Sequence, residues 1–285
     1  IWTNYNLTSL EMSDNDVTTI YIDKNDNKWI GTQHTNLAKF DGLNWDIYYE
    51  FSYEFPFGSI NEINIDSNNI IWIGTGSGIV TIEGEHWLPY SALNSFFNLD
   101  NILGITIDKN NRKWICGIDN ASAKRLIVID SSNKTLFKPL KLNLPDNFVK
   151  SIAIDKDNSK WITTNTGISN FNDNFFTYLT QFKHTFKEET IDNQINVVTI
   201  DKKGIKWIGT EYNGLVKYLD QDWIFYTTSN SPLPDNSIKS LATEGDNTVW
   251  IGTQFGGLAK LEGEAWTIYN TSSSQLPDNC INAIA

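Results

Sequence analysis

The sequence is poor in the residues that most often build metal, redox and catalytic sites. Two cysteines, three histidines and one methionine occur among its 285 residues. Cys116 and Cys280 share no metal-ligand spacing, and no two histidines share a motif, which argues against zinc and triad chemistry. We therefore expect no catalytic residue set, no metal site and no cofactor, and we interpret the cysteines as isolated thiols.

Basic charge and long apolar runs are also scarce. Lys and Arg total 22 against 34 Asp and Glu, which gives a net charge of −12. A nucleic-acid surface needs a concentrated basic face, so we expect no nucleic-acid partner. No apolar run approaches the roughly 20 residues that cross a bilayer, and we expect no direct membrane insertion within this chain. No signal peptide opens the chain, which begins Ile1-Trp2-Thr3 as a mature or trimmed protein does.

Short signatures of known chemistry are missing as well. No Gly-x-Ser-x-Gly and no phosphate-binding glycine loop occurs. The run Asp23-x-Asn25-x-Asn27 is similar to the start of a calcium loop, but His34 stands where an EF-hand requires glutamate. Similar polar runs recur throughout the chain, so we interpret them as turns rather than as ion sites.

Aromatic residues are abundant, and they repeat. A Trp-Ile pair occurs six times, at intervals of 42 to 47 residues. Its tryptophans are Trp29, Trp72, Trp114, Trp161, Trp207 and Trp250. Self-similarity at such a period is typical of propeller blades and solenoids.

Each copy has the pattern of four short strands, which we call A to D. An alternating apolar run that ends in an acidic residue (strand A, as in 19–23) precedes the Trp-Ile of strand B. Gly-Thr, a polar loop and a second apolar run such as 37–40 (strand C) follow, and Trp-x-x-Tyr as in 45–48 gives strand D. No unit shows a helical period, so the sequence predicts an all-β propeller of four-stranded blades in which the strand B tryptophan packs between neighbouring blades.

The two ends of the chain match pieces of a further blade. Residues 1–10 are similar to a strand D and the connection after it, and residues 280–285 to the start of a strand A. We therefore expect a seven-bladed ring, with six complete repeats and a split, incomplete blade whose missing strands lie beyond Ala285; a six-bladed ring is the alternative. Residues 1–285 are expected to form a single propeller domain, with blades at about 17–50, 60–90, 102–140, 148–179, 195–227 and 238–270.

The repeat resembles the two-component regulator propeller family, common in Bacteroidetes. The resemblance rests on Trp29-Ile-Gly-Thr32, Trp72-Ile-Gly-Thr75, Trp207-Ile-Gly-Thr210 and Trp250-Ile-Gly-Thr253, with Leu-Pro-Asp-Asn connections between units. It covers essentially the whole chain. Trp114-Ile-Cys-Gly117 and Trp161-Ile-Thr-Thr164, in the third and fourth blades, depart from the pattern.

The resemblance implies an extracytoplasmic protein, secreted, on the cell surface or periplasmic. Some members are sensors of hybrid histidine kinases, and others are surface proteins sorted by type IX secretion. We expect a non-catalytic recognition or interaction module of a secreted or cell-surface bacterial protein that binds a glycan, a peptide or another cell-surface protein. The alternative is the periplasmic domain of a hybrid histidine kinase that senses a glycan or peptide; a propeller lyase or glycosidase ranks last.

Polar and aromatic residues in the loops between strands B and C are the candidate ligand contacts. These loops and the strand D to strand A connections open on the same side of a propeller, where amide and aromatic groups suit sugars or peptides. The candidates are His34, Asn36, Asp119, Asn120, Asn165, Glu211, Tyr212, Gln254 and Phe255. Plain solvated turns are the alternative interpretation. Residues 118–129 and 180–191 read as insertions, where individual function often lies.

Overall fold

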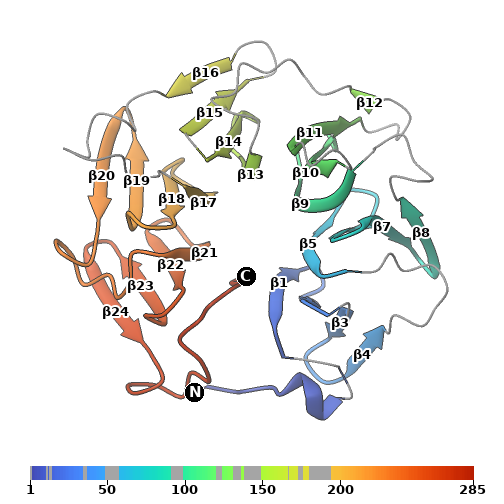
Figure 1. Ribbon diagram of the computed structural model, residues 1–285, viewed down its shortest axis with the longest axis horizontal. Helices are drawn as coiled ribbons and strands as arrows, with labels where there is room; N and C mark the ends of the chain where they lie inside the picture. The colour runs from blue at the N-terminus through green and yellow to red at the C-terminus, as the bar shows by residue number, and fades with distance from the viewer. Residues whose placement is uncertain are drawn as a thin grey trace. The chain divides into compact units, whose positions relative to one another are not determined.

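The structure, a computed structural model, describes residues 2–10, 12, 15–34, 37–48, 58–90, 99–119, 124–130, 136–137, 149–165, 167–172, 176–179 and 194–285. The chain divides into an N-terminal unit, residues 5–141, and a C-terminal unit, residues 142–284 with 1–4. Each unit contains three four-stranded sheets, in which every strand pairs antiparallel with its neighbours along the chain. These six sheets are the blades of a β-propeller (Figure 1).

The N-terminal unit holds blades 1 to 3. A short 3-10 helix, Leu7–Leu10, precedes them. The strands of blade 1 are β1 (Val17–Ile22), β2 (Lys28–Thr32), β3 (Leu37–Phe40) and β4 (Trp45–Tyr48). Those of blade 2 are β5 (Ile60–Ile65), β6 (Ile71–Thr75), β7 (Gly78–Glu83) and β8 (His86–Tyr90). Those of blade 3 are β9 (Leu99–Ile107), β10 (Lys113–Asp119), β11 (Lys124–Ile129) and β12 (Leu136–Phe137).

The C-terminal unit holds blades 4 to 6. The strands of blade 4 are β13 (Val149–Ile154), β14 (Lys160–Thr164), β15 (Gly167–Phe171) and β16 (Phe176–Leu179). Those of blade 5 are β17 (Ile195–Ile200), β18 (Lys206–Thr210), β19 (Leu215–Leu219) and β20 (Asp222–Tyr226). Those of blade 6 are β21 (Ile238–Glu244), β22 (Thr248–Thr253), β23 (Leu258–Glu262) and β24 (Ala265–Tyr269).

The six-bladed alternative matches this architecture, and the expected seventh blade is not shown. Residues 2–6 and 270–285 form no strand, although both contact blade 6: the Trp2 ring lies 5.5 Å from that of Tyr269, and the Ile281 amide donates to the Thr253 carbonyl at 2.9 Å. A strand is defined by its ladder partners, and neither segment belongs to any of the sheets in the described part of the chain. That residues 1–285 form one domain stays a prediction.

The two expected insertions have different outcomes. Most of 118–129 is regular strand, because β10 ends at Asp119 and β11 begins at Lys124. Interpreting the whole segment as an insertion was therefore wrong; a longer β10 and β11 absorb the added residues within the sheet. Residues 180–191 lie outside the described part of the chain.

The acidic residue that ends strand A organises the turn into strand B. In blade 2, Asp66 Oδ1 accepts hydrogen bonds from the amides of Asn68 at 2.8 Å and Ile70 at 3.0 Å. Its Oδ2 accepts from Trp72 Nε1 at 3.3 Å. Asn69, inside this turn, has φ of 63°, a left-handed conformation that asparagine tolerates. The polar runs are thus turns, as expected, and in blades 1, 2, 3, 5 and 6 the carboxylate also accepts a hydrogen bond from the tryptophan six residues later. In blade 4, the buried Trp161 Nε1 has no hydrogen-bond partner among the described residues.

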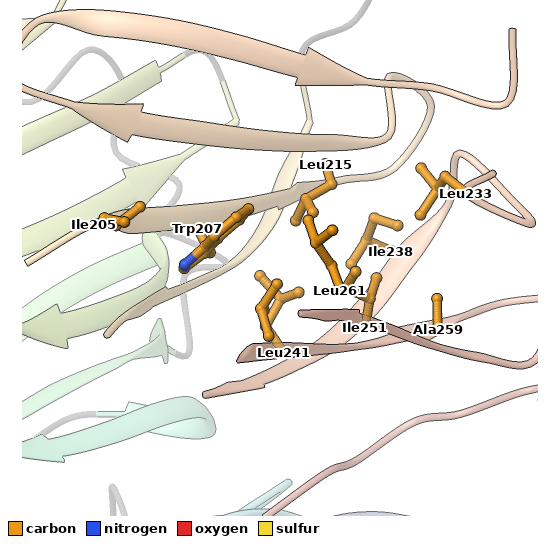
Figure 2. Close-up of a cluster of buried hydrophobic side chains, with 10 residues drawn as sticks. Ile205, Trp207, Leu215, Leu233, Ile238, Leu241, Ile251, Ala259 and Leu261 are labelled. Carbon is orange, nitrogen blue, oxygen red and sulfur yellow. The ribbon is translucent and has the colours of Figure 1, made fainter. Parts of the chain in front are cut away.

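Within each unit, strand B tryptophans pack against the next blade, as the repeat predicted: Trp29 and Trp72 do so in the N-terminal unit, and Trp161 and Trp207 in the C-terminal unit. In the C-terminal unit, Trp207 of blade 5 lies in one buried cluster with Ile238, Leu241 and Ile251 of blade 6 (Figure 2). Burying an indole removes about 150–250 Å² from water, so each such wedge contributes up to a few kcal/mol. Stacked blades therefore bury faces that one blade alone leaves exposed.

Two lysines, Lys113 buried and Lys206 part-buried, add ion pairs between neighbouring blades. Lys113 Nζ of blade 3 lies 2.8 Å from Asp66 Oδ2 of blade 2, and both side chains are fully buried. Lys206 Nζ of blade 5 lies 2.8 Å from Asp155 Oδ2 of blade 4. Each ammonium also lies over the tryptophan of the earlier blade, 5.1 Å from the Trp72 centroid and 4.7 Å from that of Trp161. In blades 3 and 5, the lysine before Trp-Ile thus joins its blade to the preceding one through a carboxylate and an aromatic ring.

Candidate functional site

The loops between strands B and C are held rigidly in blades 5 and 6. After β18, the Glu211 amide donates to the Gln194 carbonyl at 2.8 Å, and after β22 the Gln254 amide donates to the Ser237 carbonyl at 3.0 Å. Each bond ties a loop to the residue just before strand A of its own blade. The loop side chains therefore project from fixed backbone rather than from a free turn.

A bulge at the second residue of most A strands aims a polar side chain at the next blade. The register shifts at this point in β1, β5, β13, β17 and β21. In β5, Asn61 Nδ2 donates to the Ile102 carbonyl of β9 at 2.7 Å, and in β17 Asn196 Nδ2 donates to the Ile238 carbonyl of β21 at 3.1 Å. Bulges commonly redirect side chains in this way.

A chain of four polar residues, joined by two hydrogen bonds and one ion pair, crosses blades 4, 5 and 6; we call it the polar cluster. Lys150 Nζ donates to Asn196 Oδ1 at 3.0 Å, and Asn196 Nδ2 donates to Glu211 Oε2 at 2.5 Å. Glu211 Oε1 lies 3.8 Å from Lys239 Nζ. All four side chains are part-buried rather than inaccessible. The polar cluster offers ammonium, amide and carboxylate groups in fixed positions.

Two exposed aromatic side chains flank the polar cluster. Tyr212 follows Glu211 and is 58% exposed; Phe255 follows Gln254 and is 72% exposed. The Phe255 amide donates to Asp235 Oδ2 at 2.9 Å, and Ser237 Oγ bonds to Gln254 Oε1 at 3.0 Å. Both loops therefore lie against 235–239, the segment that also carries Lys239. Large exposed rings held on rigid backbone suit binding, because little conformational freedom is lost there.

The nine sequence candidates are only partly gathered. Glu211, Tyr212, Gln254 and Phe255 belong to the arrangement just described. Asn165 lies in the loop after β14, where its buried Oδ1 has no hydrogen-bond partner among the described residues. His34 is exposed and Asp119 is buried, both in the N-terminal unit. Asn36 and Asn120 lie outside the described residues. Ligand binding by these nine residues stays a prediction.

Sequence reasoning missed the bulge residues of strand A. Lys150, Asn196 and Lys239 stand at the second position of strand A, directly after an apolar first residue. A polar residue at the same position in several copies is the signal that was available. The role of that residue depends on the β-bulge that redirects its side chain, and the strand periodicity of a sequence does not reveal a bulge.

Glu62, the residue after the bulge in β5, is a second group that the sequence did not single out. Burial raises the pKa of its carboxyl to about 8, although a hydrogen bond from the Ile63 amide acts in the opposite direction. Desolvation disfavours the charged form, so Glu62 is largely protonated at neutral pH. Among the residues that the structure describes, no group of three or more His, Cys, Asp or Glu could hold a metal ion.

Replacing Glu62 with Gln is expected to stabilise the protein at pH 8 and to have little effect at pH 4. A carboxyl pKa raised on folding costs stability above the unfolded value, near 4.3, and the cost grows until the pH passes the folded value. Glu62→Gln removes that cost, so we expect a gain of about 3–5 kcal/mol at pH 8. Urea unfolding at both pH values measures it. An equal effect at the two pH values would show that Glu62 does not titrate in this range.

The comparisons with known proteins show the fold. No protein-family model and no curated protein matches the chain. The extracellular domain of BT4673, a hybrid two-component system protein from B. thetaiotaomicron, matches with a TM-score of 0.75 and 21% identity over 95% of this chain. PorZ, a surface component of the type-IX secretion system of Porphyromonas gingivalis, matches with a TM-score of 0.66 and 18% identity over 87% of the chain. Virginiamycin B lyase from Staphylococcus aureus matches with a TM-score of 0.68 and 17% identity over 89%.

These similarities define the class as a β-propeller of four-stranded blades. At such identities they carry the fold and not the chemistry, since sensor, secretion and lyase proteins share it. The chain covers 35% of the BT4673 structure, 38% of PorZ and 84% of the lyase. It therefore spans little more than a third of the first two. In the described part of the chain, no helix has the length and apolarity to cross a membrane.

Proposed function

We propose that this propeller is a non-catalytic recognition module that acts outside the cytoplasm and binds a carbohydrate at the loops of blades 5 and 6. The observation that carries the proposal is the pair of exposed rings, Tyr212 and Phe255, on loops anchored beside the polar cluster. An aromatic ring stacks on the apolar face of a sugar, and fixed amide and charged groups bind its hydroxyls.

Local charge favours a neutral ligand. The two ammonium groups of the polar cluster, on Lys150 and Lys239, are matched by the carboxylates of Glu211 and Asp235. Hydrogen bonding rather than net charge would then select the ligand. Peptides and cell-surface proteins, the other partners that the sequence allows, would use the same rings.

The sensor arrangement is a second candidate for the whole protein. It is supported by the BT4673 similarity, in which this chain matches about a third of an extracellular domain. A sensor and a secreted surface protein, including one sorted by type IX secretion, would use the same loops and differ in what is attached to them. The binding test below applies to both.

Binding is tested on a glycan array with the whole chain and a Tyr212→Ala/Phe255→Ala double variant. We expect selective binding of neutral glycans by the parent chain and at least a tenfold loss of affinity in the double variant, because each ring is worth about 1 kcal/mol or more. Leu43→Ala is the matched control, since Leu43 is exposed on a turn of blade 1. Equal loss in the control, no glycan bound, or release of a cleaved product would contradict the proposal.

A further inference from the structure

A cavity of about 420 Å³ opens beside blade 1 in the N-terminal unit, among the turns between strands A and B. Blade 1 contributes Tyr21, Asp23 and Trp29 to its wall, and blade 2 contributes Ile65 and Ile71. None of these residues belongs to the polar cluster or to the loops proposed above. Asp66 also lines the cavity, but its carboxylate is paired with Lys113. The carboxylate of Asp23, two aromatic rings and two aliphatic side chains therefore surround one space.

The same place is occupied by a lysine at two other blade junctions. Lys113 lies between Asp66 and the Trp72 ring, and Lys206 between Asp155 and the Trp161 ring. Each lysine stands directly before the tryptophan of strand B in the later blade. In blade 2 this position is Ile71.

The blade 1–2 junction thus keeps the aspartate and the tryptophan but lacks the ammonium. Asp23 Oδ1 accepts hydrogen bonds from the backbone amides of Asn25 and Asn27 at 2.8 and 3.0 Å, and its Oδ2 accepts from Asn27 Nδ2 at 2.8 Å and from Trp29 Nε1 at 3.3 Å. It forms no ion pair with any described residue, and it is half-buried where Asp66 and Asp155 are buried. Burial acts to raise its pKa, but hydrogen bonds from Asn27, Asn25 and Trp29 outweigh it and hold the pKa below the usual value. Asp23 is therefore charged at neutral pH.

A missing lysine does not by itself leave a cavity. Blade 6 has Val249 at the same position, and there both Val249 and the facing Asp201 are buried. The blades have closed over that junction. Blades 1 and 2 have not closed over their junction in this way. The cavity beside Asp23 therefore distinguishes this junction from the one at Val249.

The neighbouring lysines Lys28 and Lys39 pair with other carboxylates, so an incoming ammonium at Asp23 would compete only with the hydrogen bonds from Asn27 and Trp29 at Oδ2. Lys28 Nζ pairs with Asp26 at 2.8 Å. Lys39 Nζ lies 3.6 Å from Asp46 and 5.7 Å from the centroid of the Trp29 ring. Lys39 does not line the cavity. Lys24 does line it, on the exposed turn. A cationic ligand would meet one like charge there, at the solvent side.

We propose that this cavity binds a primary alkylammonium group on a straight alkyl chain, in the place that Lys113 and Lys206 occupy at their own junctions. The ammonium donates to Asp23 and lies near the Trp29 ring, while Tyr21, Ile65 and Ile71 cover the methylenes. The volume suits a small ligand. The lysine side chain of a peptide and a free diamine both carry this chemistry.

Binding is measured by NMR titration of the indole N–H signals of the whole chain, with 1,5-diaminopentane and with Nα-acetyl-lysine methylamide. We expect a saturable shift of the Trp29 signal, assigned with Trp29→Phe. The norleucine analogue, which lacks the ammonium, should cause no shift, and the trimethyl-lysine analogue should bind at least tenfold more weakly because it cannot donate to Asp23. Tighter binding of the diamine would indicate a free amine as the source, and tighter binding of the lysine amide a peptide.

Two variants decide whether the cavity is the site. The Ile71→Lys variant fills the cavity with a lysine side chain of the protein itself, so the ligand should no longer shift the Trp29 signal. The Ile71→Leu variant adds no ammonium, and the ligand should still shift that signal. Asp23→Asn should weaken binding at least tenfold while Lys24→Ala keeps or improves it. Ile71→Lys should also fold at least as stably as the parent, unlike Val249→Lys at the closed junction. Binding unchanged in Asp23→Asn, binding of the norleucine analogue, no saturable shift, or unfolding of Ile71→Lys would each overturn the proposal.

Discussion

Replacing Lys113 with methionine is expected to destabilise the protein by about 3–5 kcal/mol at pH 7, because the buried Asp66 loses its ion-pair partner. The Lys113 ammonium lies 2.8 Å from Asp66 Oδ2, with both side chains fully buried. Methionine keeps the length of the chain but leaves the carboxylate uncompensated. The hydrogen bonds from Asn68, Ile70 and Trp72 to Asp66 remain. The loss of stability therefore reports the contribution of the Lys113 ammonium.

Urea unfolding across pH measures this loss. Burial acts to raise the pKa of Asp66, but the Lys113 hydrogen bond and those of Ile70 and Asn68 outweigh it and lower the pKa. A carboxyl pKa lowered on folding adds stability above the unfolded value, near 3.9, and that stability disappears as the pH falls through the folded value. The Lys113→Met deficit should therefore shrink below about pH 4. Lys113→Met/Asp66→Asn should recover part of it; a constant deficit at all pH values would contradict the ion-pair explanation.

Replacing Trp207 with alanine is expected to cost about 3–5 kcal/mol, as for a buried tryptophan. Trp207 packs into the cluster of blade 6, stacks on Tyr226 with centroids 6.4 Å apart, and donates from Nε1 to Asp201 at 3.3 Å. Its removal leaves a cavity between two blades (Figure 2).

Trp250→Ala is the matched control, at the same strand position in blade 6. Trp250 also stacks on a tyrosine, Tyr269 at 6.0 Å, and donates to Glu244 at 2.9 Å, but it is only half-buried and Glu244 is exposed. We expect it to cost less than half as much. Thermal unfolding of the two variants makes the comparison, and equal losses would show that packing against the next blade is not the source of the stability.

The fold was predictable because its causes are local and repeated. Strand alternation, the Asp-rich turn and the Trp-Ile pair recur in each copy, and every copy supports the others. The number of blades was harder. Residues 1–10 and 280–285 carry the right pattern, but pattern alone cannot supply the ladder partners that would make them strands. Residues 118–129 show the complementary error, since strand extension and loop insertion have similar sequences.

The candidate site was predictable in kind but not in its details. Loop position placed Glu211, Tyr212, Gln254 and Phe255 correctly among the B–C loops, whereas Lys150, Asn196 and Lys239 act through bulges that periodicity misses. The cavity beside Asp23 depends on how closely two blades approach. Ile71 and Val249 are both aliphatic substitutes for a lysine, yet one junction is open and the other closed.

The most direct test of the recognition function is a crystal structure of the chain with the neutral glycan that binds best on the array. The account predicts an intact glycan, with a sugar ring stacked on Tyr212 or Phe255 and hydroxyls hydrogen-bonded to Glu211 or Lys239. A glycan bound away from these loops, or cleaved beside a carboxylate such as Glu62, would contradict it.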